Sequence, residues 1–223
     1  MEPSLTEIAE SIDEMSMVAA HRIGEVLGSR TVLKSDHSPA CQIRSLRHRV
    51  EGAPNFRVYG VANPTLDGIR SVIEMVWSLR GGRPVFWHNM REEPAIYING
   101  TPFVIRELER PQKSMLQNKG IDRDTLEEME ARLKEDILRE AKRYEGAIMV
   151  IHEAKDGQFF HLWEHIDADS VQTPLELYKF LEADGYPVKY ARVPIADGKA
   201  PKSSDFDTMT SNITSASKDT AFV

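Results

Sequence analysis

The order of apolar segments between residues 56 and 90 constrains the fold of this chain more than any other feature. Phe56–Val61 is short, apolar and aromatic, which suits a β-strand. Thr65–Leu79 repeats apolar residues at helical spacing and is followed by the pair Gly81-Gly82, and Pro84–Met90 is a second core-strand pattern. Strand, helix and strand in this order are typical of a sheet with crossover helices, so an α/β fold is predicted.

Later segments continue this pattern. Asn99-Gly100 separates two apolar runs, and this pair tolerates the positive φ angles of a two-residue hairpin turn. The hairpin strands are predicted over Ala95–Ile98 and Thr101–Ile105. The remaining predicted elements are helices over Thr125–Tyr144 and from Thr173 to Gly185, and strands over Ala147–Ile151, Gln158–Ile166 and Tyr186–Ile195.

The N-terminal region is predicted to precede the main domain. Ser4–Leu27 has apolar residues at helical spacing, and Gly28 is expected to end this helix. Polar, basic and turn-forming residues from Lys34 to Asn55 predict irregular structure. We therefore expect an N-terminal helical leader over residues 1–28, followed by one large domain over residues 29–223 that is long enough to bury a single core.

The composition excludes several classes of protein. No apolar run in the 223 residues reaches the roughly 18 that a membrane span requires, and the N-terminus lacks the basic-then-apolar order of a signal peptide. A single cysteine excludes an internal disulfide framework and fits a reducing compartment. The net charge of -7 disfavours nonspecific binding to nucleic acid. These features together predict a cytosolic protein.

The segment from His161 to His165 matches the inverted zinc-hydrolase pattern, His-x-x-Glu-His. Its two histidines converge on one ion only in a helix, whereas the preceding turn pair Asp156-Gly157 and the aromatic residues predict a strand. In a strand the histidines stand about 13 Å apart, at about 3.3 Å per residue, too far to share an ion. No metal or other cofactor is therefore predicted, and a zinc hydrolase is a minor alternative.

Cys41 and Arg47 are separated by the five residues that a cysteine-dependent phosphatase loop requires. Such a loop directs backbone N–H groups at a phosphate, which favours glycines within it and a core strand before it. The intervening residues contain no glycine, and the preceding residues are polar and include a proline. An incidental cysteine in a structural turn is the favoured interpretation.

Two charged residues follow predicted core strands, at the positions where α/β sheets place ligand contacts. Arg91 comes directly after Pro84–Met90, and Asp197 follows Tyr186–Ile195. Arg91 offers bidentate contacts to a phosphate or, as composition alone favours, an ion pair within the domain. Asp197 offers a carboxylate for proton transfer, although an Asp-Gly pair in a loop most often forms a turn.

Several long stretches resemble the paladin-like proteins, whose repeats are similar to the protein-tyrosine-phosphatase-like inositol-polyphosphate phosphatases, or phytases. The resemblance spans most of the chain after Gly28. The matching stretches are Thr31–His37, Asn89–Pro94, Tyr97–Gly100, Met129–Ile137 and Val193–Pro201.

This resemblance implies a mixed sheet flanked by helices, as in protein-tyrosine-phosphatase-like enzymes. It also implies a two-step phosphoryl transfer in which a cysteine thiolate attacks phosphorus and a loop aspartate protonates the departing oxygen, then activates water. Asp197 matches this general acid and base, Arg91 matches an arginine near the substrate pocket, and Lys199 adds positive charge. Related phytases often have an aspartate at the position of Asn89.

In the family, the strand that matches Thr220–Val223 runs straight into the nucleophile loop, Cys-x5-Arg. The sequence ends first, so we expect a phosphatase-like domain that is truncated before this loop. Since the nucleophile and its oxyanion site supply most of the rate, this chain alone is expected to show no appreciable turnover, and whether it is an enzyme stays open.

The resemblance implies two kinds of partner. One is a phosphorylated substrate, either a phosphotyrosine protein or an inositol phosphate, and the other is a set of further repeats in the same polypeptide. The alternative function is a non-catalytic pseudophosphatase module that acts as a scaffold, because repeats of multi-domain proteins can lose catalysis and persist.

Overall fold

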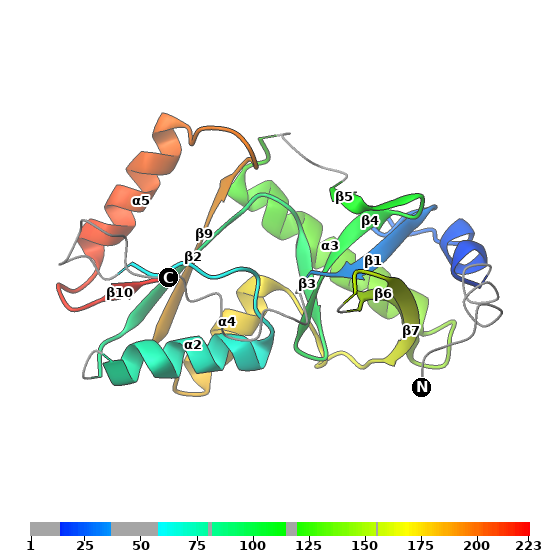
Figure 1. Cartoon of the computed structure of the whole chain (residues 1–223), viewed down its shortest axis with the longest axis horizontal. Coiled ribbons are helices and arrows are strands. Elements are labelled where there is room, and N and C mark those ends of the chain that lie inside the picture. Colours follow the sequence, from blue (N-terminus) through cyan, green and yellow to red (C-terminus); the bar gives the residue numbers. More distant parts are fainter. Residues whose placement is uncertain (1–13, 37–57, 80–81, 115–119, 155) are drawn as a thin grey trace. The chain divides into compact units, whose positions relative to one another are not determined.

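The computed structural model describes residues 14–36, 58–79, 82–114, 120–154 and 156–223 of the chain. The chain folds into two compact units whose segments alternate along the sequence (Figure 1). Each unit therefore depends on contacts between segments that are far apart in the sequence. Unit 1 contains Met1–Ala40, Pro94–Met115 and Glu128–Thr173, and unit 2 contains Cys41–Glu93, Leu116–Glu127 and Pro174–Val223.

Unit 1 is built on a mixed sheet of seven strands in the order β7-β6-β1-β4-β3-β8, with β5 paired to β4. β1 runs parallel to β6, and the other pairs are antiparallel. The predicted α/β fold with a mixed sheet is confirmed. The strands are β1 (Thr31–Ser35), β3 (Ala95–Ile98), β4 (Thr101–Glu107), β5 (Arg110–Ser114), β6 (Ala147–Glu153), β7 (Phe159–His165) and β8 (Val171–Gln172).

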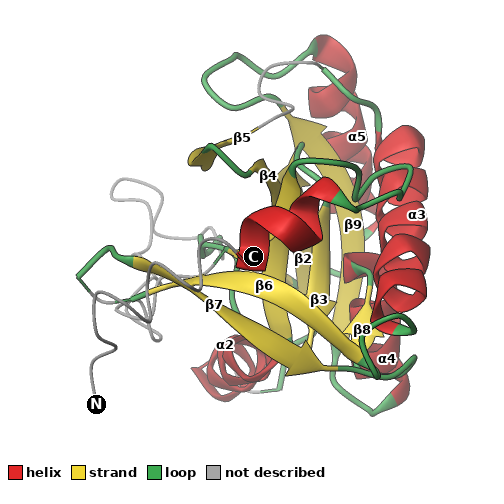
Figure 2. Cartoon of the chain, turned by 90° about the vertical axis from the view of Figure 1, so that its right-hand side faces the viewer, coloured by secondary structure: helices red, strands yellow, loops and turns green. Residues whose placement is uncertain are grey.

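Helices cover both faces of this sheet, because successive strand residues point to opposite faces and both sets are apolar. On one face lies α3 (Arg123–Ala141) (Figure 2). Its Leu133 and Ile137 side chains are fully buried among strand residues. On the other face, a helical segment over residues 14–20 packs against β1 and β6. The cluster on that second face contains Met15, Val18, Ala19, Val32, Met149 and Ile151.

β3 and β4 form the predicted hairpin. Asn99 has a φ of 50° and Gly100 a φ of 74°, the positive values that a tight two-residue turn requires. Ile98 and Thr101 pair directly across the turn, so the two-residue turn fixes the register of the hairpin.

The prediction of irregular structure from Lys34 onward is wrong for its first two residues. Lys34 and Ser35 belong to β1, which lies between β6 and β4 in the sheet. The Lys34 ammonium is 2.7 Å from Glu153 Oε2 and lies over the ring of Phe159, so its charge is satisfied within the sheet. Residues 37–57, including Cys41 and Arg47, lie outside the described residues.

The first helix ends earlier than the apolar spacing predicts. Its last described helical residue is residue 20, and turns replace the expected run to Gly28. Asp136 Oδ2 accepts the backbone N–H groups of Val26 and Leu27 at 2.8 and 3.0 Å, which satisfies them outside a helix. A Cβ atom at Gly24 would lie 2.5 Å from the Asp136 carboxylate, so this close approach requires glycine.

A buried arginine holds the same turn. The Arg22 guanidinium donates to both carboxylate oxygens of Glu140, at 3.0 to 3.2 Å. It also donates to the carbonyl oxygens of Thr31 and Met149, at 2.6 and 3.0 Å. Because a buried charge is tolerated only when it is paired and hydrogen-bonded, this network ties the N-terminal segment to β1, β6 and α3.

Unit 2 contains a parallel sheet of three strands in the order β10-β2-β9. α2 packs against β2, and α4 and α5 pack against β9. This second sheet was not predicted separately from the first. The elements are α2 (Leu66–Leu79), β2 (Val85–Arg91), α4 (Pro174–Ala183), β9 (Val188–Ile195), α5 (Ser203–Ser215) and β10 (Ala221–Phe222).

Most predicted helices and strands are present with small shifts at their ends. α3 begins at Arg123 rather than Thr125, because the Asp122 side chain accepts the Thr125 N–H at 2.9 Å and caps the helix. The predicted strand over Phe56–Val61 is reduced in its described part to isolated bridges, one of which pairs Val58 with Phe222. Among the described helices, none is long and apolar enough to cross a membrane.

Replacing Arg22 by methionine is expected to lower the free energy of unfolding by about 3 to 5 kcal/mol, because Glu140 is then left buried without its cation. Urea denaturation measures this change. The matched control is Arg132→Met, which breaks the exposed ion pairs with Glu25 and Glu128 and should leave the midpoint nearly unchanged. Equal midpoints for the two variants would contradict the structural role of the buried pair.

Candidate active site

The parallel strands of unit 2 bring all three predicted site residues to one end of their sheet. Arg91, the last residue of β2, pairs with Ile195, the last residue of β9. Asp197 and Lys199 follow Ile195 in the next turn, so they leave the sheet at the edge where Arg91 lies. β10 is also parallel to β2, and its carboxyl end points toward this edge. Ligands of open α/β sheets bind just beyond the carboxyl ends of the strands.

The loop after β9 forms a tight turn that exposes both of its charged residues. The Lys199 N–H donates to the Ala196 carbonyl at 3.1 Å, and Gly198 has a φ of 71°. Glycine adopts this left-handed conformation without strain. The side chains of Asp197 and Lys199 are exposed, so the turn presents a carboxylate and an ammonium to solvent.

Arg91 forms an ion pair with Glu93, which lies in the loop that follows β2. Its Nη2 atom lies 2.6 Å from Glu93 Oε2, and its side chain is 34% exposed. The Arg91 backbone N–H donates to Asn89 Oδ1 at 3.0 Å. The ion pair that composition favoured is therefore present, and about a third of the Arg91 side chain remains exposed to solvent.

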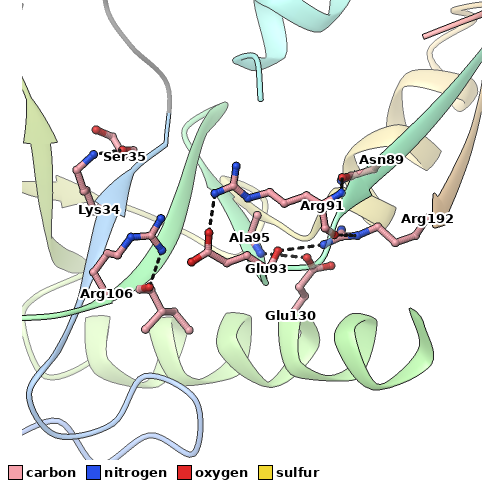
Figure 3. Close-up of polar contacts among 10 residues, drawn as sticks. Lys34, Ser35, Asn89, Arg91, Glu93, Ala95, Arg106, Glu130 and Arg192 are labelled. Carbon is pink, nitrogen blue, oxygen red and sulfur yellow. Dashed lines mark hydrogen bonds and ion pairs between the residues drawn. The ribbon is translucent and has the colours of Figure 1, made fainter. Parts of the chain in front are cut away.

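Arg192 is a buried arginine that the sequence analysis missed. It lies on β9 with 3% of its surface exposed. Its Nε donates to the Arg91 carbonyl at 2.9 Å, and its Nη2 donates to the Glu93 carbonyl at 3.1 Å (Figure 3). An arginine directly before Val193 in a predicted core strand is a signal in the sequence, but its partners come from a segment about a hundred residues earlier.

Side chains between β2 and β9 extend this network. The Tyr190 hydroxyl lies 3.3 Å from Asn89 Nδ2 and 3.4 Å from Arg192 Nη1. The Tyr190 ring stacks on Tyr178 of α4, with ring centroids 4.4 Å apart. The polar tip of Tyr190 is therefore fixed from one side by packing and from the other by hydrogen bonds.

Glu92 links the loop that follows β2 to the segment before α3. It is buried, and its Oε1 accepts the Ile121 N–H at 2.6 Å. A cavity of about 400 Å³ opens beside this segment, β9 and the start of α5. Its walls carry both signs of charge, from Asp122, Asp124 and Asp205 on one hand and Arg123, Arg192 and Lys202 on the other. This balance gives the cavity no general preference for anions.

The family model for protein-tyrosine-phosphatase-like phytases, described by inositol hexakisphosphate, matches residues 88–223, more than half of the chain. The chain belongs to this phytase family. The matched region begins in β2 and includes Arg91, Arg192, Asp197 and Lys199.

A curated relative and solved structures agree with this assignment. The phytase-family chain is 26% identical over 174 residues to paladin from Gallus gallus, and the match covers 76% of the chain but only 19% of that protein. The tandemly repeated phytase from Mitsuokella multacida has a similar fold, with a TM-score of 0.56 and 16% identity over 86% of the chain and 33% of that structure.

Another phytase, from Bdellovibrio bacteriovorus, matches with a TM-score of 0.51 and 15% identity, over 86% of the chain and 61% of that structure. At this identity the solved structures show the fold alone. The chain spans about a fifth of the curated relative and between a third and three-fifths of these solved structures.

The two histidines of the His-x-x-Glu-His pattern lie in a strand. His161 and His165 belong to β7 of unit 1, which confirms the strand prediction for this segment. Within the described residues, no group of three His, Cys, Asp or Glu side chains is placed to hold a metal ion.

His88 is a titratable residue of β2 that the sequence analysis did not select. It is buried, its ring stacks on Phe86 with centroids 4.4 Å apart, and its Nε2 lies 3.2 Å from Asn212 Nδ2 on α5. Burial lowers the pKa of His88, and a backbone hydrogen bond at Phe86 opposes this only in part. The unfolded chain therefore binds the proton more readily, and stability falls as the pH drops below about 6.5.

His88→Gln is expected to reduce the loss of thermal stability between about pH 7.5 and about pH 5.5, because it removes one group whose protonation favours the unfolded state. Burial lowers the pKa of His152 in unit 1 as well, so part of the loss remains. Melting temperatures at the two pH values measure the effect. The control is His165→Gln, an exposed position. If both variants kept the full loss, a structural role for neutral His88 would be refuted.

Proposed function

We propose that unit 2 supplies the general acid and a substrate-binding arginine of a cysteine-dependent phosphatase that acts on phosphate monoesters. The observation that supports this most is the parallel pairing of β2 with β9, with Arg91 and Asp197 at one edge. Membership of the phytase family supplies the class of reaction.

In this proposal the residues divide the work of a two-step phosphoryl transfer. A cysteine thiolate attacks phosphorus in line, the bond to the ester oxygen breaks, and Asp197 gives its proton to that oxygen. The Asp197 carboxylate then takes a proton from water as the water attacks the phosphocysteine, which releases phosphate and restores the thiolate. Arg91 binds oxygens of the substrate phosphate with its guanidinium, and Lys199 adds a positive charge to the rim.

The nucleophile is proposed to follow Val223. The single cysteine of the sequence, Cys41, is followed by five residues without a glycine, which is unlike the sequence of a phosphate loop. The family resemblance implies a Cys-x5-Arg loop after the strand that corresponds to β10, and the parallel pairing of β10 with β2 supports this, because β10 then runs toward the end of the sheet that carries Arg91. The chain of residues 1–223 alone is then expected to have no appreciable turnover.

An inositol phosphate is the proposed substrate, with a phosphotyrosine protein as the alternative. The related Mitsuokella multacida phosphatase was solved in complex with myo-inositol-(1,3,4,5)-tetrakisphosphate. A tandemly repeated relative fits further repeats in the same polypeptide. We also propose a cytosolic location, because a single cysteine fits a reducing compartment.

One observation favours a second candidate, a non-catalytic interaction module. The Glu93 carboxylate lies 2.6 Å from Arg91 Nη2 and competes with a phosphate for the guanidinium. A scaffold that no longer binds phosphate would tolerate this ion pair, whereas an enzyme must open it for each substrate.

The test is a phosphatase assay with inositol hexakisphosphate on residues 1–223 and on a longer chain that includes the residues after Val223. The longer chain is expected to turn over, and Asp197→Asn in it should lower kcat by about 10²-fold to 10⁴-fold, because the leaving oxygen then departs unprotonated. The matched control is Asp207→Asn, an exposed aspartate on α5.

Two outcomes of this assay would contradict the proposal. Turnover by residues 1–223 alone would show that the nucleophile lies elsewhere. A folded longer chain that has Cys-x5-Arg and no turnover would favour the scaffold.

A further inference from the structure

Arg192 is the buried charge between the ends of β2 and β9. A guanidinium stays protonated when buried, so its N–H groups need acceptors around it. The acceptors include the carbonyl oxygens of Arg91 and Glu93, at 2.9 and 3.1 Å (Figure 3). These two carbonyls flank the turn that follows β2, and the planar fork of Arg192 fixes the distance and the angle between them.

Arg192 also reaches the amide side of Arg91, through two other side chains. Its Nη1 donates to the Tyr190 hydroxyl at 3.4 Å, and Asn89 Nδ2 donates to the same oxygen at 3.3 Å. Asn89 Oδ1 in turn accepts the Arg91 N–H at 3.0 Å. Both backbone polar groups of Arg91 are thus connected to one buried guanidinium.

We propose that Arg192 is a positioning residue for the active site, an inference that rests on the proposed function. It holds the backbone of Arg91, and so the base of the side chain proposed to bind phosphate. Because Arg192 lies in β9 close to the strand's end at Ile195, the same contacts set where the Asp197 turn leaves the sheet. Arg192 itself is buried and acts through these residues rather than on the substrate.

The proposed role of Arg192 depends on where its charge lies along β9, because a cation elsewhere on the strand does not reach Arg91. Lys189 lies on the same strand and is exposed, and it pairs with Phe86 near the opposite end of β2. Lys189→Met therefore removes a cation from β9 without touching the contacts at Arg91. It is the matched control for substitutions of Arg192.

Amide hydrogen exchange on residues 1–223 tests whether Arg192 holds the backbone of Arg91. In Arg192→Lys the ammonium cannot replace the fork, and exchange of the Arg91 N–H is expected to accelerate at least about tenfold, as loss of a hydrogen bond to a charged group implies. The N–H of Val85, which donates to the Pro187 carbonyl in the same sheet, should keep its rate. Lys189→Met should change neither rate.

Arg192→Gln serves as a second variant if Arg192→Lys does not fold. An unchanged rate at Arg91 would overturn the proposal. Equal acceleration at Arg91 and Val85 would also overturn it, because it would show a general loss of stability in unit 2 instead of a local release.

A double-mutant cycle in the longer chain tests the effect on catalysis. If Arg192 acts through Arg91, Arg91→Lys with Arg192→Lys should raise KM no more than Arg91→Lys alone, and additive losses would contradict this. A wild-type longer chain without turnover would refute the proposed function instead. The exchange rates would then still test, independently of catalysis, whether Arg192 holds the backbone of Arg91.

Discussion

The buried guanidinium of Arg192 is the constraint on which the candidate site depends. A charge without solvent must be surrounded by acceptors, and here two of them are carbonyl groups at the end of the neighbouring strand. The loop after β2 is therefore not free to vary its path, although loops are usually the mobile part of a fold. Arg91 gains a fixed base at the edge of the sheet from which Asp197 also departs.

Unit 1 uses the same device for another purpose. Arg22 is buried against Glu140 and two strand carbonyls, and Asp136 binds two amides of the adjoining turn. Both arginines donate hydrogen bonds to backbone carbonyl oxygens of other segments. In unit 1 the result is the attachment of an N-terminal segment, and in unit 2 it is the geometry of a site.

Local patterns in the sequence predicted the elements whose stability is local. The apolar spacing of α2 and α3 and the Asn99-Gly100 turn each leave a short-range signal. β1 was missed because Lys34 is a charged residue whose partner, Glu153, lies on β6. The division into two units was missed for a related reason, since the two sets of segments interleave along the chain.

The site shows the same limit. Arg91 and Asp197 were predicted as site residues from their places after core strands and from the family resemblance, because their positions follow from local order. Arg91 and Asp197 lie at the same end of the sheet only because β2 and β9 pair in parallel register. The role proposed for Arg192 follows only from its hydrogen bond to a residue of β2. No spacing within the sequence contains that information, because the segments that meet are about a hundred residues apart.

Paramagnetic relaxation measures whether the carboxyl ends of β2 and β9 lie side by side. A spin label at Lys199→Cys, with Cys41 replaced by serine, should broaden the amide signals of Asn89 to Glu93. A label at Lys189→Cys should instead broaden those of Val85 to Trp87. Broadening at the opposite end of β2, or no broadening from the label at position 199, would show that the two strand ends do not lie together.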